Sequence, residues 1–224
     1  MLTLHHLEYS QSFRVLWLLE ELGADYELKL YQRDPVTILA PDAYKKASPL
    51  GTAPYITEGD FALSETNAIV DYIMDRYPES GLVPAVSDPD RTRHLFWYDA
   101  SQASLMPMML MNAVMRISLQ RSPVFIKPIL KSVNGKIVSG MIKPRVDKLL
   151  QLAEEALQEA PWFGGRNFST ADIAMSYPLE SARSRGFLEG GYPACSEWFE
   201  RAYAREAFIR AKEKDGRESM ILPV

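Results

Sequence analysis

Hydrophobic and polar positions alternate along the first 80 residues in short blocks whose spacing changes from one block to the next. Runs with alternate apolar positions predict strands, whereas apolar residues at i, i+3 and i+4 predict helices. Gly23 ends the first helical block, and Glu58-Gly59-Asp60 separates two short apolar runs as in a hairpin. The blocks predict strands over 2–9, 26–31, 54–57 and 61–64 and helices over 12–22 and 65–77, with a loose helical connection before the hairpin.

The remainder of the chain has helical spacing almost throughout. Four punctuating residues, Pro78, Gly81, Pro84 and Pro89, predict a linker before it. Helices are predicted over about 90–118, 124–159, 170–185 and 193–214. We therefore expect an α/β plus all-α protein, with an α/β domain at 1–80, a linker at 81–89 and an all-helical domain at 90–224.

Composition excludes several function classes. The 224 residues are 47% hydrophobic, which is typical of a folded protein. The net charge of −4 gives no overall positive potential that would attract nucleic acid or anionic lipid. A single cysteine, Cys195, excludes an internal disulfide and a cysteine-based zinc site. Residues 104–115, the longest weakly polar stretch, are too short to span a membrane. We expect no signal peptide, because His5, His6 and Glu8 interrupt the first apolar run. We expect a soluble, cytoplasmic protein.

The charge is unevenly distributed. Between Ala100 and Val146 there are seven basic residues and no acidic ones. A solvated or interface face is the favoured interpretation of such a block, and attraction of small anions or of an acidic partner is the alternative.

Three segments could bind a ligand, and a fourth looks structural. Residues 9–14 lie where a helix N-terminus favours an anion, although Ser10 or Ser12 could simply cap that helix. In the segment 48–56, a cis Pro54 would free the Ala53 backbone to pair with a peptide, although trans is the commoner isomer. The segment 63–69 could hold an amino acid through Glu65 and Thr66, or could be a plain N-cap.

The fourth segment, 168–173, has Ser169 and Asp172 at capping-box spacing. Phe168 and Ile173 have the spacing of a hydrophobic staple. This segment is predicted to hold a core helix in place and to make no contact with substrate.

In order and spacing, the four segments resemble the soluble glutathione transferases. The matching stretches are YSQSFRVLWLLEELG, SPLGTAPYI, LSETNAIVDYI and FSTADIA, which together span nearly the whole chain. The resemblance implies a thioredoxin-like N-terminal domain that binds glutathione and a helical domain that shapes an electrophile pocket. It also implies a homodimer, a detoxification role and glutathione as the co-substrate.

The resemblance also assigns residues. Ser10 falls where serine-type members keep the hydroxyl that stabilises the glutathione thiolate, and Tyr9 is its rival as the tyrosine-type residue. Thr52, Ala53 and a cis Pro54 would bind the glutathione backbone, and Glu65 and Thr66 would bind its γ-glutamyl group. Gly51 and Thr52 offer no cation for the glycyl carboxylate, so Lys45 or Lys46 is the candidate for that contact.

Five of the ten methionines lie between Met106 and Met115, and flexible thioethers suit a pocket for varied apolar shapes. We nominate Met106, Met109 and Phe13 for the electrophile pocket, with core packing as the alternative for most of the methionines. A metal site at His5, His6 and Glu8 is rejected because neighbouring strand residues point to opposite faces.

The expected function is a glutathione transferase that attacks apolar electrophiles or organic hydroperoxides without a metal. The alternative is a non-catalytic glutathione-binding or protein-interaction module on the same fold.

Overall fold

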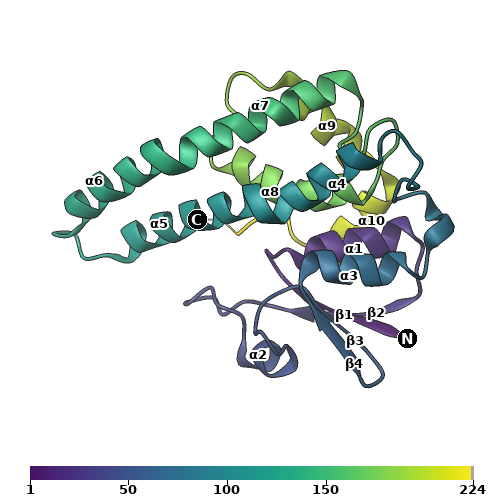
Figure 1. Cartoon of the computed structure of the whole chain (residues 1–224). Coiled ribbons are helices and arrows are strands. Elements are labelled where there is room, and N and C mark those ends of the chain that lie inside the picture. The colour runs from purple at the N-terminus through teal and green to yellow at the C-terminus, as the bar shows by residue number, and fades with distance from the viewer. Residues whose placement is uncertain (223–224) are drawn as a thin grey trace.

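The computed structural model describes residues 1–222, which form a sheet domain below a helical domain (Figure 1). The sheet has the order β2-β1-β3-β4, in which β1 and β2 are parallel and the other pairs antiparallel. Leu4 on the central β1 lies opposite Leu28 of β2 and Ile56 of β3. The four strands are β1 (Leu2–Leu7), β2 (Tyr26–Tyr31), β3 (Tyr55–Glu58) and β4 (Phe61–Ser64).

Two helices separate the sheet from the helical domain, and a third lies at its edge (Figure 1). Helix α1 (Ser12–Glu21) is buried over almost its whole length because it also packs against α8 and α10. Helix α3 (Thr66–Met74) packs beside α1, and α2 (Asp42–Ala47) lies within the proline-rich connection. This arrangement places the N-termini of α1 and α3 between the two domains.

Two long helices, each with an internal π-helical turn, form a hairpin that extends beyond the rest of the helical domain (Figure 1). The first comprises α4 (Arg91–Ala100), a π-turn at Ser101–Leu105 and α5 (Met106–Arg121). The second comprises α6 (Lys127–Ile137), a π-turn at Val138–Ile142 and α7 (Lys143–Glu159). Pro107 and Pro144 follow the turns directly, where the wider helix accommodates a residue that cannot donate a backbone hydrogen bond.

Helix α8 (Thr170–Ser184) runs through the centre of the helical domain. The predicted capping box is confirmed, because Ser169 Oγ accepts from the Ala171 N–H and Asp172 accepts from the Ser169 N–H at 3.0 Å. Buried Asp172 also accepts from Trp198 Nε1 at 2.9 Å, and therefore ties α8 to α9 (Pro193–Tyr203). Cys195 is fully buried, as expected for a small apolar side chain.

The expected fold class is confirmed, a thioredoxin-like domain followed by a helical one, but the first strand and the final predicted helix differ from expectation. The first strand ends at Leu7 because Tyr9 has a positive φ of 51°. The helix predicted over 193–214 is two helices, α9 and α10 (Glu206–Asp215), because Arg205 is extended and pairs with Glu21 of α1. The loose helical connection predicted before the hairpin is confirmed, and it contains one short helix, α2.

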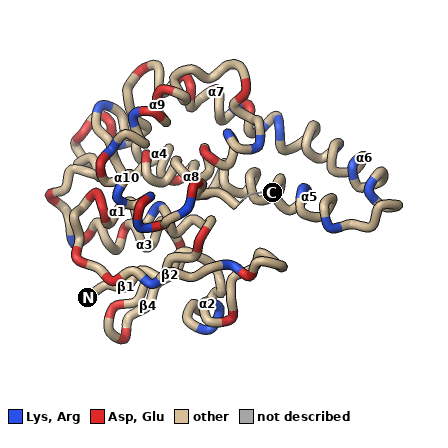
Figure 2. The backbone as a smooth tube through the Cα atoms, turned by 180° about the vertical axis from the view of Figure 1, so that it is seen from behind, with Lys and Arg blue, Asp and Glu red and all other residues tan. Residues whose placement is uncertain are grey.

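Figure 2 shows the basic block as Lys and Arg along α5 and α6 without Asp or Glu between them. No helix within residues 1–222 is long and apolar enough to cross a membrane.

Candidate active site

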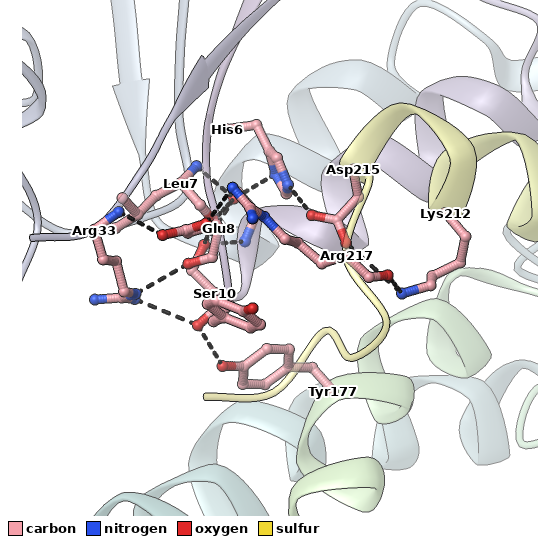
Figure 3. A network of polar contacts seen from close by, with 11 residues as sticks. His6, Leu7, Glu8, Ser10, Arg33, Tyr177, Lys212, Asp215 and Arg217 are labelled. Carbon is pink, nitrogen blue, oxygen red and sulfur yellow. Dashed lines mark hydrogen bonds and ion pairs between the residues drawn. The ribbon is translucent and has the colours of Figure 1, made fainter. Parts of the chain in front are cut away.

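The Ser10 hydroxyl lies at the N-terminal end of α1, in a buried cluster of polar side chains (Figure 3). Its Oγ donates to the Leu7 carbonyl at 2.6 Å, lies 2.7 Å from Ser12 Oγ and accepts from the Ser12 N–H at 3.2 Å. Ser12 is thus part of the site as well as of the first turn of α1. The Ser10 side chain therefore has inward partners for both its proton and its lone pairs.

Two residues that the sequence analysis did not select complete this cluster. His6 on β1 places Nδ1 2.8 Å from Ser12 Oγ, and its Nε2 lies 2.8 Å from Oδ1 of Asp215 at the end of α10. All three side chains are buried. Asp215, His6, Ser12 and Ser10 therefore form one continuous chain of hydrogen bonds between α10 and α1.

The neighbouring Tyr9 is fixed mainly through its backbone. Its carbonyl accepts from Tyr177 Oη at 3.2 Å and from Arg33 Nη2 at 3.3 Å. Half-buried Tyr9 lines a pocket of about 360 Å³ together with residues 184, 185, 218, 219, 221 and 222. The guanidinium of Arg217 lies 5.9 Å from the Tyr9 ring and pairs with Glu8 at 2.5 Å. Tyr9 thus faces the C-terminal segment, whereas Ser10 faces the start of α1.

The Ala53–Pro54 peptide bond is cis, as the family resemblance implied and as the residues alone did not favour. Pro54 is buried and precedes β3, whereas Thr52 is exposed and Ala53 half-buried. The Thr52 carbonyl accepts from Ser48 Oγ at 3.2 Å and from Tyr44 Oη at 3.3 Å. These bonds fix the loop that carries the exposed Thr52 and the Ala53 backbone.

Glu65 and Thr66 open helix α3 in different environments. Glu65 is exposed and has a φ of 76°, a left-handed conformation that is uncommon for residues other than glycine. Thr66 is 1% exposed, and its Oγ1 accepts from Arg14 Nη2 at 3.3 Å. The exposed carboxylate and the buried hydroxyl therefore flank the positive end of the α3 dipole.

Arg14 is a fully buried cation whose hydrogen-bond partners in the described part of the chain are all neutral. Besides Thr66 it donates to the Ala174 carbonyl at 2.9 Å, to Gln102 Oε1 at 3.2 Å and to Gln11 Oε1. Burial lowers its pKa to about 10, so it remains charged at neutral pH. No ion pair of Arg14 occurs among residues 1–222. Positive potential is therefore concentrated between the N-termini of α1 and α3.

The two candidate lysines both lie exposed on α2. Lys45 pairs with Asp42 at 3.3 Å, and its side chain approaches the loop at Gly51. Lys46, the next residue of α2, is also exposed.

The residues nominated for the electrophile pocket lie in different surroundings. Phe13 is 1% exposed and packs edge-on against Phe208, on the side of α1 that faces α10. Met109 is fully buried, and only Met106 is partly open to solvent. A substrate could touch Phe13 or Met109 only if the core opened, so their placement is that of core residues.

A separate pocket of about 1140 Å³ lies between α5, α6, α7 and residues 185–192, and Met115 rather than Met106 lines it. Arg185 borders both this pocket and the one beside Tyr9.

In the described part of the chain, no group of three His, Cys, Asp or Glu side chains is placed to hold a metal ion. His5 is hydrogen-bonded to Tyr31 and Thr57, whereas His6 is hydrogen-bonded to Ser12 and Asp215.

Comparison with known proteins identifies the family. The model of the glutathione S-transferase N-terminal domain matches residues 4–81, and that of the C-terminal domain matches residues 119–201. Glutathione S-transferase 3 of Schizosaccharomyces pombe is 31% identical over 215 residues, covering 96% of this chain and 88% of that protein. Glutathione S-transferase 1 of Saccharomyces cerevisiae is 28% identical over 225 residues, covering 96% and 95%.

Solved structures agree with this assignment. A glutathione S-transferase from Actinobacillus pleuropneumoniae superposes with a TM-score of 0.74 at 31% identity, over 96% of this chain and 93% of that one. One from Xylella fastidiosa has a TM-score of 0.78 at 22% identity, over 96% and 99%, and shows the same fold. The chain belongs to the soluble glutathione S-transferase family.

Proposed function

We propose that the protein is a glutathione transferase in which Ser10 stabilises the glutathione thiolate. The observation that carries this proposal is the Ser10 hydroxyl at the N-terminal end of α1. The names of the two yeast relatives support the general activity. The acceptor would be an apolar electrophile attacked by the thiolate. With an organic hydroperoxide, two glutathione molecules would be oxidised to the disulfide while the peroxide gives an alcohol and water.

The energy required is within the reach of these groups. A thiol with a pKa near 8.5 is only a few per cent ionised at pH 7. Lowering the pKa by about two units requires about 2.7 kcal/mol of preferential stabilisation of the anion. A charge-assisted hydrogen bond from Ser10 would contribute about 1.5–3 kcal/mol and the N-terminus of α1 about 0.3–1 kcal/mol. These two contributions suffice without a metal or a second base.

The same arrangement suggests how glutathione would lie. The Ala53 backbone before the cis Pro54 would pair with the cysteinyl backbone, with Thr52 beside it. Thr66 and the N-terminus of α3 would hold the γ-glutamyl carboxylate, and the exposed Glu65 would hold its ammonium group. Lys45 or Lys46 would reach the glycyl carboxylate. In this scheme residues 1–80 bind glutathione and residues 90–224, with Met106, shape the electrophile pocket across the linker at 81–89.

We also propose that the protein acts as a cytoplasmic homodimer in detoxification. This part of the proposal depends on the family, and sedimentation of the purified protein tests the dimer directly.

Matched hydroxyl deletions test the central assignment. Ser10→Ala should reduce turnover with an aryl halide by about tenfold to a hundredfold, whereas Tyr9→Phe should leave it nearly unchanged. Ultraviolet absorbance of bound thiolate should show the glutathione pKa rising in Ser10→Ala only. Loss of activity in Tyr9→Phe with retention in Ser10→Ala would assign the role to Tyr9 instead.

The inward hydrogen bond from Ser10 to Leu7 favours one alternative, a glutathione-binding protein without catalysis. Calorimetry that shows glutathione binding, combined with no activity toward aryl halides, isothiocyanates or hydroperoxides and an unshifted thiol pKa, would support that alternative.

A further inference from the structure

The chain Asp215–His6–Ser12–Ser10 has a direction, because each hydrogen bond in it needs one donor and one acceptor. Asp215 Oδ1 is 2.8 Å from His6 Nε2, and a carboxylate can only accept. In a singly protonated imidazole this contact places the proton on Nε2 and leaves Nδ1 as an acceptor. Nδ1 in turn takes the proton of Ser12 Oγ, which lies 2.8 Å away.

This direction determines what Ser12 can offer to Ser10. Once its proton is committed to His6, Ser12 Oγ is available only as an acceptor at 2.7 Å from Ser10 Oγ. The Leu7 carbonyl, at 2.6 Å, is also an acceptor. Both neighbours therefore compete with a bound sulfur for the single proton of Ser10. A reversed chain, in which His6 donates to Ser12, would let Ser12 donate to Ser10 or Leu7, so that only the Leu7 carbonyl would still compete with a bound sulfur for the Ser10 proton.

We propose that His6 and Asp215 are positioning residues for Ser10, which set the direction of the buried hydrogen-bond chain and thereby how readily Ser10 donates to glutathione sulfur. This inference rests on the proposed function, because it concerns the same hydroxyl. Neither His6 nor Asp215 touches the reacting atoms.

The surroundings of Asp215 allow the chain to be reversed by one isosteric change. Asp215 Oδ2 lies 3.7 Å from Lys212 Nζ, on the other side from His6. In Asp215→Asn the amide oxygen should turn toward the Lys212 ammonium group, so the amide N–H faces His6 Nε2. His6 must then carry its proton on Nδ1, donate to Ser12 and reverse the chain.

The test is a double-mutant cycle with the pKa of bound glutathione thiol as its readout. Asp215→Asn should lower this pKa by about half a unit or more. The same change made in Ser12→Ala, where the chain is cut, should shift it by about 0.2 unit or less. An effect of the lost Asp215 charge alone would be equal in both backgrounds. Circular dichroism and urea unfolding of each variant show that the fold is intact.

Equal shifts in the two backgrounds, or no shift in Asp215→Asn, would overturn the proposal. His6→Gln supplies a second comparison. In that background too, Asp215→Asn should shift the pKa of the bound thiol by about 0.2 unit or less. The outcome is separable from that of the proposed function. If Ser10→Ala alters the thiol pKa while the cycle is additive, only the role of His6 and Asp215 fails. If Ser10→Ala has no effect, the assignment of Ser10 itself fails.

Discussion

Arg14 Nη2 donates to Thr66 Oγ1 at 3.3 Å and so joins the first turn of α1 to the first residue of α3. Since Thr66 accepts this bond, its own proton remains available for a carboxylate. The guanidinium is fully buried, and it also reaches Gln102 and the Ala174 carbonyl in the helical domain. One side chain therefore supports the proposed γ-glutamyl contact and links it to the second domain.

Arg14→Lys should destabilise the protein although it keeps the charge. A lysine ammonium group cannot reproduce the planar fork that serves several acceptors, and each buried acceptor left without a donor costs roughly 1–3 kcal/mol. We expect the free energy of unfolding to fall by about 2–4 kcal/mol in urea titrations. Arg76→Lys, at a more exposed pair with Glu58, is the control and should change it by less than about 1 kcal/mol. Equal losses in both variants would contradict the role given to Arg14.

Two replacements of Thr66 should distinguish the contribution of its hydroxyl group to glutathione binding from the contribution of its packing. Thr66→Val keeps the shape but removes the donor, so glutathione should bind roughly tenfold more weakly, as expected for one charge-assisted hydrogen bond. Thr66→Ser keeps the hydroxyl and should bind within about threefold of the parent protein. Isothermal titration with glutathione measures both values. Unchanged affinity in Thr66→Val would exclude the proposed carboxylate contact.

The protein should be less stable in mild acid than at neutral pH because of buried His94. This side chain is 2% exposed, with Nδ1 3.1 Å from Ser169 Oγ, and burial lowers its pKa to about 4, with a smaller contribution from Arg91. The unfolded chain takes up the proton near pH 6.5, so between about pH 6.5 and pH 4 it binds more protons than the native state. Stability should therefore fall by about 3 kcal/mol over this window.

Urea titrations at several pH values would measure this loss. His94→Gln, which cannot titrate, should lack that part of the pH dependence although it is less stable overall. An identical pH profile in the two proteins would show that other groups cause the effect.

Gly164→Ala should disturb the start of α8. A Cβ atom on Gly164 would lie 2.6 Å from Ser169 Cβ and 3.0 Å from the Asn167 carbonyl, so the capping box would have to move. Overpacking of this kind costs about 1–3 kcal/mol, which thermal or urea unfolding would detect. Gly191→Ala, where nothing lies within 4 Å of the added atom, should change stability by less than about 0.5 kcal/mol. A loss no larger in Gly164→Ala than in Gly191→Ala would contradict this explanation.

The parts of the structure that depend on neighbouring residues were predictable from the sequence. The capping box of Ser169 and Asp172 follows from a three-residue spacing, and the hairpin from Glu58-Gly59-Asp60. Helical periodicity identified Phe13 and Met109 as apolar positions, but it does not state which neighbour covers a given face. In the folded protein the side chains of Phe13 and Met109 are both buried in the core.

The features that depend on distant residues were not predictable in this way. His6 and Asp215 are 209 residues apart, and nothing in either local segment marks them as partners. The cis isomer of Pro54 was favoured only by the family resemblance, because the residues alone favour the commoner trans isomer. In the sequence, Arg14 is only a single basic residue in an apolar helix. Its place beside Thr66 and Gln102 results from tertiary packing.

The pairing of His6 with Asp215 bears on synthesis of the protein. A ribosome releases β1 well before α10, because the carboxylate that orients the His6 imidazole is translated 209 residues later. A nascent chain that had already folded its sheet would thus hold Ser10 without the complete set of partners. The hydrogen-bond chain behind the proposed nucleophile site becomes complete only after α10 has been translated.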